Sequence, residues 1–247
     1  MSTKTSNLHI IALHEMYFLV ANVETATDWY VRNFGVTLVD RQAKRTTLRL
    51  AEGSLLTLIE SDQRNKFDSP PINFKAHDAM RAHELLNKAE VRAQEPESFY
   101  HYVDFDVWDP DGNSFNVISD PAWPSTPNNF FRIDGIFLGV INFEQMLVWY
   151  ADVLGAELEY AFTGPTSTLA EARFRCFRDI PFNLVESPES VMQHRVCEFQ
   201  TTDAQADYKF LQAKGVRVTE LIEQDGKRTF SFFDPEGREL GMVELLA

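Results

Sequence analysis

Apolar side chains recur at helical spacing in two similar stretches of the chain. In residues 20–38 they stand three and four positions apart at Val23, Ala26, Tyr30 and Phe34, and in residues 140–158 at Phe143, Leu147, Tyr150 and Leu154. This spacing predicts an amphipathic helix in each stretch. A glycine, Gly35 or Gly155, follows each one and is expected to end the helix, because glycine adopts the left-handed conformation at little cost.

The two stretches are copies of one another. VANVETATDWYVRNFGVTL and VINFEQMLVWYADVLGAEL align with an offset of 120 residues. The identical pairs are Val20/Val140, Asn22/Asn142, Glu24/Glu144, Trp29/Trp149, Tyr30/Tyr150, Gly35/Gly155 and Leu38/Leu158. We interpret this as an internal duplication.

Strand-like runs surround both helices. An apolar run precedes each helix, at residues 16–20 and 136–140, and three runs of β-type composition follow it. These runs cover residues 36–41, 45–52 and 55–61 in the first copy, and 156–162, 167–177 and 181–187 in the second.

A second helical unit follows in each half. Residues 72–78 lead into a predicted helix at 79–90, and residues 196–203 into one at 204–215, with Asp78 and Asp203 as N-caps. Later strands are joined by the turns DPDG, from Asp109, and DPEG, from Asp234. Asp, Pro and Gly suit positions i, i+1 and i+3 of a type I turn, so each turn is expected to close a hairpin, with Gly112 and Gly237 free to take positive φ.

The pattern as a whole predicts an α+β fold of four βαβββ modules in two pairs. The expected domains are residues 1–120 and 130–247. PAWPSTPNN, residues 121–129, is the expected linker because it combines three prolines with Ser, Thr and Asn.

Composition narrows the class of protein. No apolar run approaches the roughly 18 residues that cross a bilayer, and the N-terminus has no secretory signal pattern, so we expect a cytoplasmic protein. The net charge of −14, from 37 acidic and 23 basic residues, argues against binding to nucleic acid or to an anionic membrane surface. Cys176 and Cys197 lack paired spacing and are expected to be buried, reduced thiols. A small molecule is the expected partner.

The combined motifs resemble a known family. The helix ends WYVRNFG and WYADVLG, each followed some 75 to 80 residues later by DPDGN or DPEGR, are similar to those of the vicinal oxygen chelate superfamily, which includes glyoxalase I, bleomycin-resistance proteins and extradiol dioxygenases. The resemblance implies paired modules, each pair a half-barrel with its helices outside. It also implies, for the enzymes, one divalent metal held by His, Gln or Glu at fixed strand positions.

The resemblance places these ligand positions at mostly unsuitable residues. In the first half they fall at Glu15, near Thr57, near Pro71 and at Asn116, and in the second half at Gly135, Asn183, Val196 and Gly241. Only Glu15 is a good donor, whereas a metal needs at least three. His14 adjoins Glu15, but strand alternation turns it to the opposite face. The sequence therefore predicts no metal site and no cofactor; if the chain is an enzyme, the cofactor would be Fe, Mn, Ni or Zn.

A polar pocket is the alternative kind of site. In the fosfomycin-resistance branch of the family, residues three and five places before the turn face the cavity, which implies Asp106 and Asp104 in the first half and Ser231 and Thr229 in the second. With Glu15 and Asn116, the two aspartates would form an acidic pocket that binds a cation or amine, or raises a carboxyl pKa. The competing interpretation is a solvated edge face.

Aromatic residues share these strands. Phe105, Val107, Phe230 and Phe232 are expected in the core because they alternate with the polar positions. Tyr102 and Trp108 have the parity of the two aspartates and could stack on a flat ligand.

Two functions remain open. One is a metal-free protein that binds or sequesters a small molecule between modules, as bleomycin-resistance proteins do. The other is a metal-dependent lyase or dioxygenase-like enzyme with a non-standard site, because activation of vicinal oxygens needs a Lewis acid. A monomer or a homodimer is expected in either case.

Overall fold

The chain forms two compact units. The computed structural model describes residues 8–63, 70–122, 130–166, 168–178, 180–188 and 195–246. The middle unit is Met16–Ile136, and the terminal unit combines Met1–Glu15 with Phe137–Ala247, so it contains both chain ends. Most of the expected linker, residues 123–129, lies outside the described residues.

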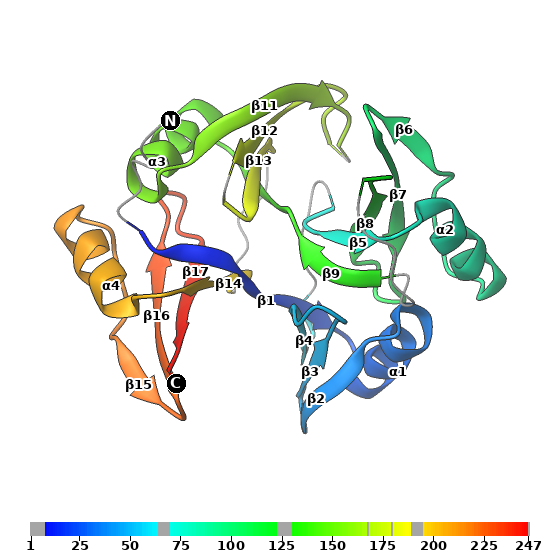
Figure 1. Ribbon diagram of the computed structural model, residues 1–247, viewed down its shortest axis with the longest axis horizontal. Coiled ribbons are helices and arrows are strands. Elements are labelled where there is room, and N and C mark those ends of the chain that lie inside the picture. Colours follow the sequence, from blue (N-terminus) through cyan, green and yellow to red (C-terminus); the bar gives the residue numbers. More distant parts are fainter. Residues whose placement is uncertain are drawn as a thin grey trace. The chain divides into compact units, whose positions relative to one another are not determined.

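The middle unit, drawn in blue to green in Figure 1, contains two βαβββ modules and one further strand among its described residues. Its elements are the end of β1 (Ile10–Val20), α1 (Val23–Phe34), β2 (Thr37–Gln42), β3 (Arg45–Arg49), β4 (Leu55–Glu60), β5 (Asn73–Ala76), α2 (Ala79–Lys88), β6 (Glu97–Phe99), β7 (Tyr102–Trp108), β8 (Ser114–Ser119) and β9 (Phe130–Asp134). The strand orders are β1-β4-β3-β2 and β6-β7-β8-β5-β9.

The terminal unit repeats the plan. It contains the start of β1 and all of β10 (Ile136–Val140) but its first residue, then α3 (Phe143–Leu154), β11 (Glu157–Gly164), β12 (Ala172–Arg178), β13 (Phe182–Glu186), β14 (Cys197–Thr201), α4 (Ala204–Ala213), β15 (Ile222–Gln224), β16 (Lys227–Phe233) and β17 (Glu239–Leu245). Its strand orders are β10-β13-β12-β11 and β15-β16-β17-β14-β1. The predicted α+β class and the four modules are confirmed.

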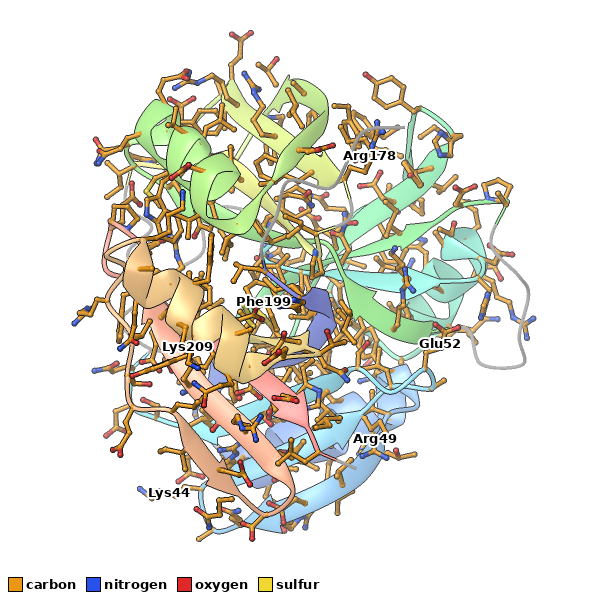
Figure 2. All side chains as sticks on the ribbon, turned by 60° about the vertical axis from the view of Figure 1, so that its left-hand side comes forward. Lys44, Arg49, Glu52, Arg178, Phe199 and Lys209 are labelled. Atoms are coloured by element: carbon orange, nitrogen blue, oxygen red, sulfur yellow. The ribbon has the colours of Figure 1, made fainter. Side chains whose placement is uncertain are left out.

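The helices begin and end where local chemistry predicts. Asp78 and Asp203 accept hydrogen bonds from the backbone N–H groups of Arg81 and Ala206, at 3.0 and 2.9 Å, and so cap α2 and α4. Gly35 and Gly155 have φ of 62° and 69° after α1 and α3. Helix α4 leaves Lys209 exposed, whereas Phe199 on β14 is fully buried; Figure 2 labels both.

Two segments differ from the arrangement that the duplication alone predicts. The start of β1 belongs to the terminal unit, where the backbone N–H of His9 donates to Asp207 Oδ1 at 3.0 Å and the His9 ring nitrogen lies 2.7 Å from the same oxygen. Strand β9 follows the linker yet belongs to the middle unit, where Ile133 pairs with Phe74 of β5. Hydrophobic periodicity cannot predict such pairings, because they join residues far apart in sequence.

The repeated turn ties the two modules of the middle unit together. Asp109 is buried, and its Oδ2 accepts from the Tyr30 hydroxyl of α1 at 3.0 Å and from Asn113 Nδ2 at 2.7 Å. Asn113 Nδ2 also donates to the Leu19 carbonyl of β1 at 3.2 Å. Burial raises the pKa of both Tyr30 and Asp109. The turn therefore links the first helix and strand of one module to the hairpin of the next.

In the terminal unit the equivalent turn is held by an ion pair between Asp234 and Arg238. Asp234 Oδ2 accepts from the Tyr150 hydroxyl at 3.0 Å and from Arg238 Nη1 at 2.7 Å. Arg238 also donates to the Gly139 carbonyl. The side chain of Arg238 is 1% exposed and that of Asp234 is 0% exposed. The residue after the turn, Asn in one copy and Arg in the other, is thus a structural partner of the turn aspartate.

The expected core residues and the two cysteines are buried, as the sequence predicts. Phe105, Val107, Phe230 and Phe232 are all buried. Cys176 and Cys197 are buried free thiols, and burial raises the pKa of Cys176 to about 11. No helix in the described part of the chain is long and apolar enough to cross a membrane.

Candidate functional site

Each unit has an equivalent position in its sheet, and polar residues of the two adjacent strands pair with it. In the middle unit Asn116 of β8 pairs with Asn73 of β5 on one side and with Asp106 of β7 on the other. In the terminal unit Gly241 of β17 pairs with Glu198 of β14 and with Ser231 of β16. The duplicated strands therefore carry different chemistry on one shared frame.

Two carboxylates and an imidazole converge in the terminal unit. Among the described residues, one group of His, Cys, Asp and Glu side chains brings three ligand atoms within 4.8 Å of one another, and it consists of His14, Glu15 and Glu198. Glu15 and Glu198 are each only 6% exposed. Neighbouring carboxylates in such surroundings repel one another unless a cation lies with them. One imidazole and two carboxylates are N and O donors of the kind that hold Zn²⁺ or Mn²⁺.

His14 is a correction to the sequence interpretation. Alternation predicts that its Cβ points away from that of Glu15, and on that ground His14 is excluded as a ligand. Its ring nitrogen nevertheless lies within 4.8 Å of both carboxylate ligand atoms. Alternation fixes the direction in which a side chain leaves the strand, whereas the position of a histidine nitrogen also depends on its rotamer.

Gly241 makes room for Glu198. A Cβ atom built on Gly241 would lie 3.1 Å from Cβ and Cγ of Glu198 and 3.2 Å from its Oε1. Contacts of this length are tighter than ordinary van der Waals contact. The glycine, which from sequence counts against a metal site, is thus what allows the carboxylate of the adjacent strand to lie there.

A guanidinium group lies beside Glu198. Arg195, just before β14, donates from Nη1 to Glu198 Oε1 at 3.2 Å, from Nε to Glu239 Oε1 at 3.1 Å and from Nη2 to Ser231 Oγ at 2.5 Å. The Ser231 hydroxyl in turn donates to Glu239 Oε1 at 2.7 Å. Burial alone would raise the pKa of Glu239, but the hydrogen bonds from Ser231 and Arg195 outweigh it and lower that pKa. Glu239 is therefore ionised at neutral pH.

The middle unit brings three of the predicted residues together. Asn116 Nδ2 donates to Asp104 Oδ2 at 2.9 Å and to Asp106 Oδ1 at 3.1 Å. Burial raises the pKa of Asp104, and it raises the pKa of Asp106 to about 6, with Asp104 and Glu97 adding repulsion. Strand β7 lies between β6 and β8, so the solvated-edge interpretation is wrong for this pair.

The other predicted site residues are divided between the units. Glu15 belongs to the terminal unit and lies with His14 and Glu198, so the predicted carboxylates form two groups, one in each unit. Ser231 lies in the Arg195 network, and Thr229, two residues earlier, is half-buried on the same strand. In the middle unit Tyr102 lies against His101, with ring centroids 4.1 Å apart. The guanidinium of Arg92 lies over the Trp108 ring, 4.2 Å from its centroid.

Glu198 is not among the ligand positions that the family resemblance implies. The expected ligand position on this strand is Val196, which is fully buried. Glu198 follows two residues later, and a shift of two keeps the same strand face. Asn73 has the same relation to the expected Pro71 in the first half. A search of the neighbouring same-face positions would have found a carboxylate beside Glu15.

Comparisons with known proteins agree with this architecture. Residues 132–241 match the Glyoxalase/Bleomycin resistance protein/Dioxygenase superfamily. The fold is similar to that of a proposed dioxygenase from Bacillus subtilis, with a TM-score of 0.75, 12% identity, and coverage of 96% of this chain and 86% of that one. It is also similar to glyoxalase I from Zea mays, with a TM-score of 0.67, 18% identity, and coverage of 94% and 92%. No curated protein matches the sequence.

These findings define the class of protein. Residues 132–241 form a domain of the glyoxalase, bleomycin-resistance and dioxygenase superfamily, and the fold of the whole chain, with its paired βαβββ modules, is similar to that of glyoxalase I and of the Bacillus protein. The resemblance expected from the repeated motifs is confirmed. This superfamily supports a role in binding or converting a small molecule. Because one fold hosts many activities, the particular function depends on the residues of each site.

Proposed function

We propose that the terminal unit binds one divalent metal ion through His14, Glu15 and Glu198, and that the protein is a metal-dependent enzyme acting on a small molecule. The observation that carries the proposal is the convergence of these three donors within 4.8 Å, with both carboxylates nearly buried. This is the alternative hypothesis from the sequence, and the donor set now favours it over the metal-free one.

The donor set defines the chemistry that this unit would support. A divalent ion held there would supply a Lewis acid for two neighbouring oxygens of a substrate. Glu239, ionised and 31% exposed, can accept a hydrogen bond from a substrate group. Arg195 and Ser231 hold Glu239 in place through hydrogen bonds. The two buried, free thiols fit a reducing compartment, so we propose that the protein acts in the cytoplasm.

Metal content and affinity test the proposal. The protein, purified and depleted with a chelator, should bind one Mn²⁺ or Zn²⁺ per chain in calorimetric titration, and its unfolding temperature should rise as the metal saturates the site. Chelation should reverse the rise. The proposal would be contradicted if neither ion binds in the titration and if protein from cells grown with both metals contains neither. The metal-free hypothesis would then be restored.

A second candidate function concerns the middle unit. We propose that Asp104 and Asp106, held by Asn116, bind a small cationic ligand without a metal. The two carboxylates share one amide donor and are partly buried, so a cationic group would relieve their repulsion. Trp108 and Tyr102, on the same strand face, would contact the apolar part of such a ligand.

Binding of a diamine should depend on pH in a defined direction. The pKa of Asp106 is about 6, so its ionised fraction, and with it the affinity for putrescine, should rise about tenfold between pH 5 and pH 7. An aspartate at its ordinary pKa would already be ionised at pH 5 and would give a flat profile. The Asp104→Asn/Asp106→Asn variant should lose binding, whereas Asp28→Asn, on the exposed side of α1, should not. Equal binding by all three proteins would refute this function.

A further inference from the structure

Arg195 stands against the proposed metal ligands, and we propose that it competes with the metal ion for Glu198 and thereby sets the affinity of the site. The inference rests on the proposed function of the terminal unit. It is carried by a separate contact, the hydrogen bond from the Arg195 guanidinium to Glu198, one of the three proposed metal ligands.

The guanidinium group is held from three directions. Nη1 donates to Glu198 Oε1 at 3.2 Å, while Nε and Nη2 donate to Glu239 and Ser231 at 3.1 and 2.5 Å. The Arg195 side chain is 35% exposed, whereas that of Glu198 is 7% exposed. Arg195 thus reaches from the more accessible side to a nearly buried carboxylate.

The charges explain why a cation is present. Burial of an ionised carboxylate is costly unless a cation or several hydrogen-bond donors lie with it. In the protein without metal, Arg195 supplies the positive charge beside Glu198. A divalent ion held by the same residue would meet the positive charge of Arg195, and the Glu198 carboxylate would be shared between two cations.

Glu239 allows the arginine to give way. Glu239 Oε1 accepts from Arg195 Nε and from the Ser231 hydroxyl, so the guanidinium keeps an anionic partner if its bond to Glu198 lengthens. The backbone N–H of Ser231 donates to Thr219 Oγ1 at 2.8 Å, which fixes Ser231 in position. Arg195 can therefore shift toward Glu239 without losing all its partners.

The test is the metal affinity of charge variants, which is measured without any substrate. Metal-depleted wild type, Arg195→Gln and Arg195→Lys would be titrated with MnCl₂ and ZnCl₂. Removal of the charge in R195Q should tighten binding about tenfold, the effect expected of one partly screened charge at short range. R195K keeps the charge and should stay within about threefold of wild type. Arg228→Gln, which removes an arginine paired with Glu223 and Glu244, should bind like wild type.

The outcomes separate this inference from the proposed function. If the wild type binds metal and R195Q binds it with equal or lower affinity, the competition is overturned. A lower affinity in R195Q would show that Arg195 positions Glu198. Binding by R195Q alone would support the competition while refuting a metal-loaded wild type. Binding by neither would refute both. If R195Q does not fold, Arg195→Met, which keeps the aliphatic stem, takes its place, with thermal unfolding before and after MnCl₂ as a second readout.

Discussion

Replacement of Asp234 by asparagine should destabilise the terminal unit by about 3–5 kcal/mol, because it removes the closer of the two carboxylates paired with the buried guanidinium of Arg238, the other being Glu236 at 3.9 Å. Arg238 is 1% exposed and donates to Asp234 Oδ2 at 2.7 Å. Asparagine also has one acceptor oxygen, whereas Asp234 accepts at both, from the Arg238 backbone N–H at Oδ1 and from the Tyr150 hydroxyl at Oδ2. Hydrogen–deuterium exchange is the suitable measurement, because peptides from β16 and β17 report on this unit and peptides from β7 and β8 on the middle one.

Two further variants isolate the role of the charge. Asp109→Asn changes the equivalent turn of the middle unit, where the partners are neutral, and should cost less, about 1–3 kcal/mol. The double variant Asp234→Asn/Arg238→Met removes both charges and should recover most of the loss. If Asp234→Asn lowers the free energy of unfolding no more than Asp109→Asn does, the ion pair is not what stabilises this turn. Failure of the double variant to recover stability would show the same.

Replacement of Glu198 by glutamine should weaken Mn²⁺ or Zn²⁺ binding by about 100-fold or more. Even partners of metal ligands typically contribute 10–100-fold, and Glu198 is proposed as a direct ligand. Glu15→Gln should have a similar effect, because its carboxylate is in the same group. Calorimetric titration of metal-depleted protein measures both losses.

A milder change at the same place provides a graded control. Gly241→Ala would put a Cβ atom 3.2 Å from Glu198 Oε1, so the carboxylate must move by a few tenths of an ångström and metal binding should weaken by less than in Glu198→Gln. Glu186→Gln, which alters a carboxylate paired with Arg173 in the same unit, should leave the affinity unchanged. Retention of wild-type affinity by both Glu198→Gln and Glu15→Gln would exclude the proposed ligand set.

Much of the fold is predictable from local chemistry. The helices, their aspartate and glycine caps and the repeated turns follow from side-chain spacing and backbone preferences, which act over a few residues. The family resemblance implies a pocket position for the aspartates of β7, with a solvated edge as the alternative, and alternation within the strand places both on one face. These features need no knowledge of distant contacts.

The candidate metal site could not be predicted in the same way. Its donors come from β1 and β14, which lie far apart in the chain and meet only when the sheet forms. Glu198 stands two residues beyond the expected position, and its space depends on a glycine of a third strand. Arg195 adds a charge that no motif indicates. Non-local pairing thus determines the site, while sequence periodicity determines the elements that carry it.

The division of β1 between the two units has a consequence for dissecting the protein. A fragment beginning at residue 130, where the duplication suggests a cut, would carry Glu198, Arg195 and Glu239 but neither His14 nor Glu15. Such a fragment would also lack the strand that lies beside β14. Fusing residues 8–15 to it, in the manner of a circular permutation, would bring all three proposed metal ligands into one continuous fragment.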